Sequence, residues 1–209
     1  MIDERFIILG AVLNLLGSLS YVRDTLRGKT RPNRVSWFLW AAAPLIAFSA
    51  ELGQGVGLPA LMTFMAGFCP LLIFLSSFVN RKSVWKLTRL DMVCGALSVF
   101  GLILWQITGS GYLAIVFSIL ADGLAGVPTV VKSWKEPESE NWHAFFFGGT
   151  SAALTLLALD NWDFAHYGFP VYLFGICLLL VLLIKFKLGV RHKPLPDTLL
   201  KGEDERPLP

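Results

Sequence analysis

Residues 121–141 read ADGLAGVPTVVKSWKEPESEN, and 108 positions earlier residues 13–33 read LNLLGSLSYVRDTLRGKTRPN. The same offset pairs Asn14 with Asp122, each the main polar residue of an apolar stretch. It also relates identical residues across three successive apolar segments: Leu16 and Leu124, Val22 and Val130, Asn33 and Asn141, Phe38 and Phe146, Ala50 and Ala158, Gly67 and Gly175, Cys69 and Cys177, Phe78 and Phe186. This ungapped register predicts an internal repeat, and repeats that flank a spare helix are typical of several transporter folds.

The composition indicates a membrane protein. Hydrophobic residues make up 55% of the chain and charged residues 16%, with a mean hydropathy of +0.61. The charges cluster between long apolar runs, as in a polytopic helical membrane protein. Lipid offers no hydrogen-bond partner to free backbone groups, so each run is expected to form a helix. No basic block has the size or the interleaved aromatic residues of a nucleic-acid site.

The apolar runs predict seven membrane-spanning helices. Most are near the roughly 20 residues that cross a bilayer. Their connections are short, so successive helices are expected to be antiparallel neighbours. The predicted spans are Phe6–Arg23, Val35–Glu51, Leu58–Phe78, Met92–Ile107, Tyr112–Val131, Trp142–Leu159 and Phe169–Lys185.

The basic residues lie in alternate connections. The second connection carries only Glu51, the fourth is neutral, and the sixth carries Asp160 and Asp163. Basic loops stay in the cytoplasm, so we expect an inner- or plasma-membrane protein with its N-terminus outside and its C-terminus cytoplasmic. The first, third and fifth connections and the tail hold the basic residues: Arg23, Arg27, Lys29, Arg31 and Arg34; Arg81, Lys82, Lys86 and Arg89; Lys132 and Lys135; Lys185, Lys187, Arg191 and Lys193.

The repeat and the spans together predict the domain organisation. Residues 1–81 form a first triple-helix repeat, 82–111 hold the linker helix 4, and 112–190 form the second repeat. One linker helix gives both triplets the same orientation, so the repeats are expected to be parallel. Residues 191–209 are rich in proline and charge and predict a disordered cytoplasmic tail.

This layout resembles the PQ-loop superfamily, which includes the SWEET sugar transporters. The most specific stretch is Ala121–Thr129, running through Lys132–Lys135 into Pro137–Asn141. A proline near the cytoplasmic end of a triplet's first helix, followed by a polar loop, is the signature region of that family. Thr129 follows Pro128 where the name-giving members have glutamine, so the PQ dipeptide is absent. The resemblance implies seven helices that transport a small solute by alternating access.

The same resemblance bears on the solute. Sugar-carrying relatives place an asparagine on the third helix of each triplet, and neither Leu58–Phe78 nor Phe169–Lys185 contains one. The matched positions nearest mid-helix are Cys69 and Cys177, which we therefore include among candidate solute-binding residues. Small buried packing residues are the alternative interpretation of these cysteines.

Asp122 is the strongest candidate for chemistry. A carboxylate at the bilayer centre costs a few kcal/mol, so such residues face the bundle interior and often mark ion or substrate pathways. A proton-linked role is one interpretation, and a hydrogen-bonded acid that fixes helix packing is the other. Its repeat mate Asn14 is a candidate for solute contact or for interhelical hydrogen bonding. Asn33 and Asn141 precede helices and are predicted to be N-caps.

Prolines and one tryptophan complete the candidate set. Proline removes a helical hydrogen bond and kinks the helix, so each of them is either a hinge for alternating access or a static kink. Trp40 lies three residues deeper than Trp37 and is a candidate gate, whereas aromatics at helix ends are usually interface anchors. The candidate hinges are Pro44, Pro70, Pro128 and Pro170.

The resulting prediction is an all-α membrane protein that transports a small solute. The alternative is a non-transporting receptor or cargo-binding protein of the same fold. No nucleophile–base pair or metal-ligand spacing is visible, so an enzyme, a metal and a cofactor are not expected. The expected partners are the lipid bilayer and an unidentified small solute, and a homo-oligomer is compatible with the sequence.

Overall fold

The computed structural model describes residues 3–53, 58–80, 85–108, 111–160, 162 and 164–189. These residues form seven α-helices and one short 3₁₀ turn, with no strand among them, which confirms the all-helical prediction. Each predicted span coincides with one helix to within a few residues. The helices are α1 (Phe6–Leu26), α2 (Arg34–Gly53), α3 (Pro59–Ser76), α4 (Arg89–Thr108), α5 (Gly111–Lys135), α6 (Trp142–Ala158) and α7 (Phe164–Lys185), and the turn is η1 (Pro137–Ser139).

Local sequence signals fix several helix ends. The Asn33 side chain accepts hydrogen bonds from the backbone N–H groups of Val35 and Ser36, at 3.1 and 3.4 Å. Asn141 accepts one from the N–H of His143 at 2.8 Å. Both asparagines are therefore N-caps, as predicted. Gly28 follows α1 with a φ of 74°, a conformation that glycine adopts at helix C-termini without steric cost.

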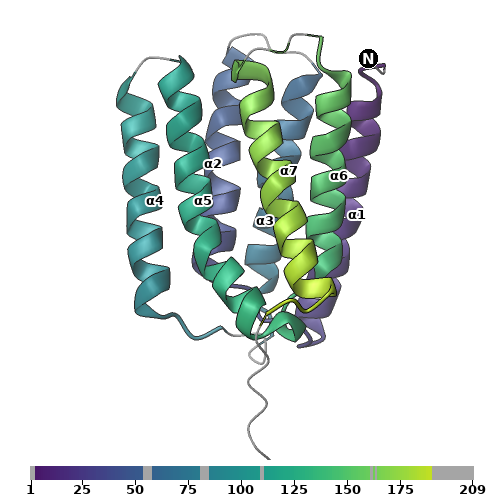
Figure 1. The fold of residues 1–209 in the computed structure, drawn as a ribbon, viewed down its shortest axis with the longest axis vertical. Helices are drawn as coiled ribbons and strands as arrows, with labels where there is room; N and C mark the ends of the chain where they lie inside the picture. Colours follow the sequence, from purple (N-terminus) through teal and green to yellow (C-terminus); the bar gives the residue numbers. More distant parts are fainter. Residues whose placement is uncertain are drawn as a thin grey trace, which may run out of the picture.

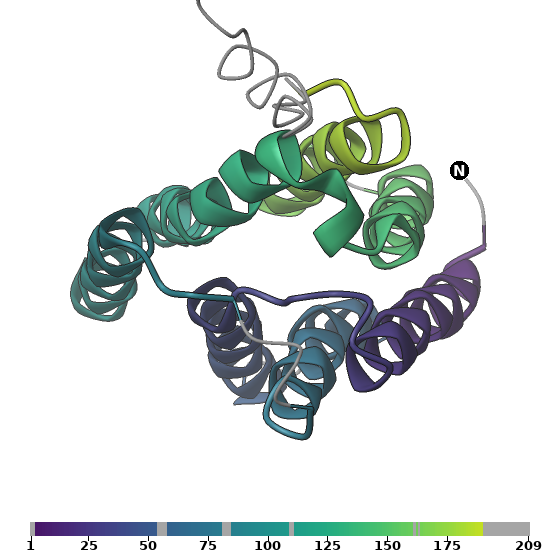
Figure 2. The same ribbon diagram turned by 90° about the horizontal axis from the view of Figure 1, so that it is seen from below.

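The helices run side by side and alternate in direction (Figure 1). Seen end-on, α1, α3 and α2 form one layer, and α6, α7, α5 and α4 form the other (Figure 2). The chain begins at the end that carries the even-numbered connections, here called the even-loop end. The opposite, odd-loop end carries the connections from α1 to α2, α3 to α4 and α5 to α6. Consequently α1 runs in the same direction as α5, α2 as α6, and α3 as α7.

Within each layer the third helix of a triplet lies between the other two. α3 contacts α1 and α2, and α7 contacts α5 and α6. The expectation that all successive helices are neighbours is therefore wrong, because in the described part of the chain the backbones of α1 and α2 do not pack against each other, nor do those of α3 and α4 or of α5 and α6. The layers meet where α1 packs against α6 and where α2 packs against α5. If α1–α3 and α5–α7 changed places, each of these two contacts would become the other. The linker α4 lies against α5 and α2.

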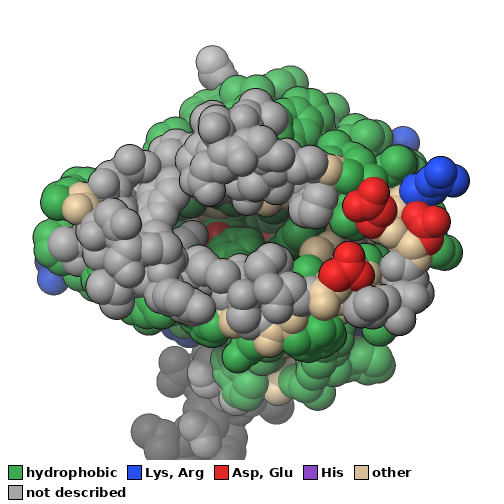
Figure 3. All heavy atoms as spheres, turned by 90° about the horizontal axis from the view of Figure 1, so that it is seen from above, with side chains coloured by type: hydrophobic (Ala, Val, Ile, Leu, Met, Phe, Trp, Pro, Cys, Tyr) green, Lys and Arg blue, Asp and Glu red, His purple; other side chains and the backbone are tan. Residues whose placement is uncertain are grey.

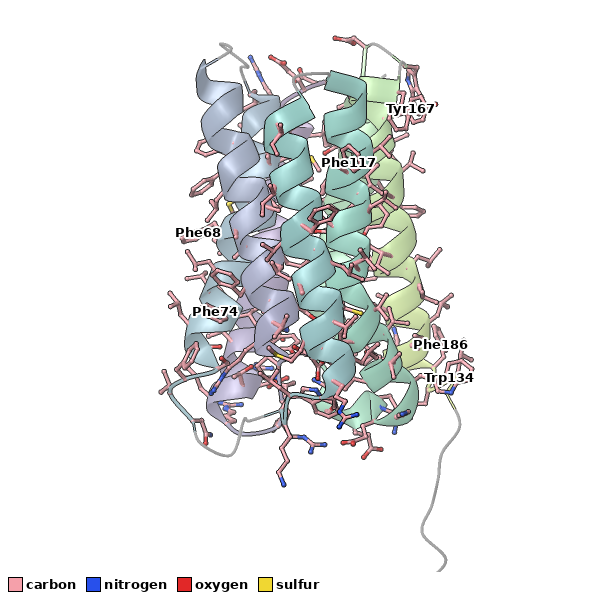
Figure 4. All side chains as sticks on the ribbon, turned by 90° about the vertical axis from the view of Figure 1, so that its left-hand side faces the viewer. Phe68, Phe74, Phe117, Trp134, Tyr167 and Phe186 are labelled. Atoms are coloured by element: carbon pink, nitrogen blue, oxygen red, sulfur yellow. The ribbon has the colours of Figure 1, made fainter. Side chains whose placement is uncertain are left out.

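The outer surface is apolar. Trp134 and Phe186 lie near the odd-loop end and Tyr167 near the even-loop end (Figure 4). Each helix exposes large apolar side chains, which a soluble monomer rarely does over so wide an area. Examples, one from each helix, are Leu16, Phe38, Leu75, Phe100, Leu120, Leu157 and Leu178.

Two helices in the described part of the chain, Phe6–Leu26 and Tyr167–Lys185, are each long and apolar enough to cross a bilayer. Leu61–Ser76 is a shorter apolar helix. Two helices of this kind are weak evidence for a membrane, so the seven spans stay a prediction. The tail, residues 191–209, lies outside the described residues, and so do Gly109 and Ser110 of the fourth connection.

Candidate functional site

A cavity lies between the two layers. Its volume is about 90 Å³, which is room for several waters or a small organic solute. Viewed from the even-loop end, the molecule is hollowed at its centre (Figure 3). Six helices line the cavity, and among the described residues α4 contributes none: Asn14 and Ser18 from α1; Trp37, Trp40 and Pro44 from α2; Ala66 and Pro70 from α3; Asp122 from α5; Ala144, Phe145 and Gly148 from α6; Phe169, Leu173, Ile176, Cys177 and Leu180 from α7.

Three pairs of lining residues are separated by the repeat offset of 108. Asn14 and Asp122 are one pair, and the other two are Trp37 with Phe145 and Trp40 with Gly148. The rings of Trp37 and Phe145 lie 5.9 Å apart between centroids, so matched positions of α2 and α6 meet across the two layers. The cavity therefore brings together side chains of α1–α3 and α5–α7 that are 108 positions apart in the sequence.

Asp122 faces the interior, as predicted. The residue is 8% exposed, and one carboxylate oxygen, Oδ2, accepts a hydrogen bond of 2.8 Å from the Tyr172 hydroxyl on α7. The indole N–H of Trp40 donates to the backbone carbonyl of Asp122 at 3.2 Å. The carboxylate is therefore held from α7 and the backbone of the same residue from α2, while no described Lys or Arg forms an ion pair with Asp122.

The other candidate residues divide between the cavity and the helix contacts. Asn14 and Trp40 line the cavity, as does Cys177. Cys69 does not, because it is buried between α1 and α3 against Ala11 and Met65. The four prolines all lie within helices, and of these Pro44 and Pro70 line the cavity whereas Pro128 and Pro170 are buried outside its lining.

Aromatic rings close the cavity toward the odd-loop end. We call Tyr21, Trp37, Trp40 and Phe145 the aromatic floor. Trp37 is at its centre, with ring centroids 4.9 Å from Tyr21 at an interplanar angle of 61° and 5.1 Å from Trp40 at 88°. Edge-to-face packing of this kind adds about 0.5–1.5 kcal/mol per pair beyond the burial of area. The floor is thus a packed barrier.

Below the floor lies a buried polar cluster, here called the odd-loop network, made of Tyr21, Arg31, Lys132 and Glu140. The ammonium group of Lys132 donates to the Glu140 carboxylate and to the backbone carbonyl of Arg31. The Tyr21 hydroxyl donates to the other oxygen of Glu140. The side chains of Lys132 and Glu140 are 0% exposed, so this ion pair is shielded from solvent and joins α1, α5 and the connection before α6.

Further hydrogen bonds tie the helix ends around this network. Asn141 donates to the Asp24 carboxylate at 2.7 Å, which joins the start of α6 to the end of α1. Asn33 donates to Asp91 and so joins the start of α2 to α4. Arg34 donates to the backbone carbonyl of Ser77 at 2.7 Å, beyond the end of α3. The odd-loop end is consequently cross-linked by polar contacts.

Sequence reasoning missed Tyr172, Ser18 and the odd-loop network. Tyr172 resembles an interface aromatic in sequence. The charges of Lys132 and Glu140 look like those of solvated loops, although a glutamate eight residues after a lysine across a helix end was a signal that they could pair. Their common partner Tyr21 is more than 100 residues away, and only the fold brings it near.

No group of three or more His, Cys, Asp or Glu in the described residues is placed to hold a metal ion. Comparison with family models, with curated proteins and with solved structures finds no match for this chain.

Proposed function

We propose that this chain is a seven-helix membrane protein that moves a small solute by alternating access between α1–α3 and α5–α7. The observation that carries the proposal is the cavity, to which three helices of each triplet contribute and which holds a buried carboxylate. It is hollow toward the even-loop end and closed toward the odd-loop end. A cavity at the interface of two repeats, sealed at one end, is what alternating access requires.

Membrane insertion is part of this proposal. Its support is the exposed apolar surface on all seven helices and the basic residues at the odd-loop end. Reporter fusions at Gly53 and Pro194 are expected to report opposite sides of the membrane, with Pro194 cytoplasmic. Both reporters on one side would contradict the seven-span arrangement and its orientation.

The parallel triplets and the PQ-loop type of organisation belong to the same proposal. Their support is the 108-residue register and the central position of α3 and α7 in their triplets. Superposing α1–α3 on α5–α7 in an experimental structure is expected to bring Asn33 onto Asn141 and Cys69 onto Cys177. A match that needs a register shift would contradict the repeat.

Cys177 allows a test of alternating access before the solute is known, because it is the one cavity-lining residue among three described free cysteines. A variant with Cys69→Ala and Cys94→Ala keeps Cys177 as its reactive thiol. In sealed vesicles of each orientation, a membrane-impermeant methanethiosulfonate reagent is expected to modify Cys177 from both sides. The same protein with Cys177→Ala is the control and is expected to remain unmodified.

Modification from the even-loop side alone would contradict alternating access and favour the receptor or cargo-binding alternative. Counterflow in proteoliposomes against sugars, amino acids, vitamins and organic cations then identifies the solute. Proton linkage, the further part of the proposal, predicts that transport depends on pH and that Asp122→Asn removes this dependence while keeping the fold. An unchanged pH profile in that variant would make Asp122 structural.

A further inference from the structure

The cavity carries a negative charge without a basic counterpart. Asp122 is the charged residue among the described lining residues, and they include no Lys, Arg or His. The nearest buried cation on the same helix, Lys132, is occupied by Glu140 beneath the aromatic floor. A carboxylate in an apolar site is costly unless a counter-charge or a proton neutralises it. The described lining of the cavity therefore lacks a positive charge to pair with Asp122.

The cavity walls also favour a positively charged solute. Trp37, Trp40, Phe145 and Phe169 all line the cavity, and the rings of Trp40 and Phe145 lie 6.3 Å apart at an interplanar angle of 77°. The faces of aromatic rings attract cations, and aromatic walls are how proteins recognise quaternary ammonium groups. Asp122 and these rings thus offer two independent sources of attraction for one cation.

Other classes of solute fit less well. An anion would meet the Asp122 carboxylate without a compensating basic group. A sugar needs a hydrogen-bond partner for most of its hydroxyl groups. Besides the indole N–H groups of Trp37 and Trp40, the polar side chains of the described lining are few: Asn14, Ser18, Asp122 and Cys177. A neutral apolar solute would leave the carboxylate unpaired in a drier cavity.

We infer that the cavity binds a small organic monocation, an ammonium group on a compact apolar body. Its positive charge pairs with Asp122, and its alkyl groups contact the rings of Trp37, Trp40 and Phe145. This inference rests on the proposed function and names the solute class of the same cavity. The Tyr172 hydroxyl donates to Oδ2 and so holds the carboxylate at the cavity, where it pairs with the cationic solute.

A matched pair of ligands tests the charge alone. Choline and its neutral carbon isostere, 3,3-dimethylbutan-1-ol, have nearly the same shape. Binding to the purified full-length protein can be followed by calorimetry and by the change in tryptophan fluorescence, to which Trp37 and Trp40 contribute among the seven tryptophans of the chain. We expect choline to bind at least about tenfold more tightly than the isostere. Equal affinities, or no binding of choline or of tetramethylammonium below about 10 mM, would overturn the inference without the need for any variant.

Two variants locate the effect. Asp122→Asn removes the charge with little change of shape, and we expect the affinity for choline to fall about tenfold while that for the isostere stays within about twofold. Asp160→Asn makes the same charge change at an exposed position outside the cavity lining and is expected to bind choline as the wild type does. An Asp122→Asn protein that unfolds with the wild-type midpoint and keeps its preference for choline would overturn the assignment of Asp122.

The outcomes separate this inference from the transport proposal. Choline binding that depends on Asp122, together with Cys177 modification from one side only, would keep the cation site and overturn transport. Counterflow of a neutral solute without any preference for choline would keep transport and overturn the cation site.

Discussion

The two halves of the molecule, α1–α3 and α5–α7, present different chemistry to the cavity at matched positions. The first half contributes neutral Asn14 where the second contributes Asp122. The first half fills the site with Trp40, whereas Gly148 at the matched position adds no side chain. The two halves thus have similar helix arrangements but different side chains at the cavity. The charge and shape of the cavity come from these differences.

The strongest contrast in stability is expected between Lys132 and its repeat mate Asp24. Lys132→Met leaves the Glu140 carboxylate buried and unpaired, so we expect the free energy of unfolding to fall by about 3–5 kcal/mol. Asp24→Asn is expected to cost less than about 1 kcal/mol, because Asp24 is partly exposed and the amide still accepts a hydrogen bond from Asn141. Unfolding by sodium dodecyl sulfate, followed by circular dichroism in mixed micelles, measures both.

A double variant checks the physical reason for this contrast. Lys132→Met combined with Glu140→Gln removes both charges while the amide oxygen can still accept from Tyr21. It is expected to recover much of the loss of the single variant. If the double variant is as unstable as Lys132→Met alone, then packing around Lys132 rather than the unpaired charge explains the effect.

Gly67 and its mate Gly175 are identical in type but differ in their surroundings. A Cβ at Gly67 would lie 2.7 Å from Leu45 Cγ and 3.0 Å from the carbonyl oxygen of Ala41, whereas a Cβ at Gly175 would meet nothing within 4 Å. Gly67→Ala is therefore expected to destabilise the protein by about 1–3 kcal/mol. Gly175→Ala is expected to be neutral or slightly stabilising, since alanine favours helix by about 1 kcal/mol. The same unfolding assay ranks them, and equal effects would show that α2 and α3 can separate at little cost.

The smallest effect on stability is expected at Gly148, which lines the cavity at the position matched to Trp40. A Cβ there would lie 3.5 Å from Cys177 Sγ and 3.9 Å from Asn14 Oδ1, which is ordinary contact. Gly148→Ala is therefore expected to change the free energy of unfolding by less than about 0.5 kcal/mol. Because the methyl group takes room from the solute, we expect choline affinity to fall about threefold to tenfold. Fluorescence titration measures it, Gly175→Ala is the control, and unchanged affinity would place the solute elsewhere.

The sequence predicted the helices well because long apolar runs, the caps Asn33 and Asn141 and the short polar connections are all local signals. Asp122 could be placed in the interior because an intramembrane acid has few other options. Helix order within a layer was not predictable. A connection as short as residues 27–33 is long enough to pass the end of α3, so a short loop does not make α1 and α2 neighbours.

The site could be predicted only in part for the same reason. Cys69 and Cys177 share a register position, yet Cys69 is covered by Ala11 and Met65 while Cys177 reaches the cavity. Tyr172 and the odd-loop network depend on contacts between distant segments, which no spacing along the chain encodes. Sequence reasoning thus identified Asn14, Asp122 and Cys177 in the cavity but neither Ser18 nor the residues that hold the polar groups in place.

The pairing of Asn14 with Asp122 has a consequence for the ancestry of such a chain. A protein assembled from two identical three-helix subunits would have to place the same residue at both positions, so an acid in one copy would bring a second acid to the same cavity. Two neighbouring carboxylates repel each other and share protons, which would weaken the preference for a single cation. Joining both copies in one polypeptide lifts that constraint, because each position can then mutate alone. A single chain that encodes the two positions separately can therefore hold one negative charge in the cavity.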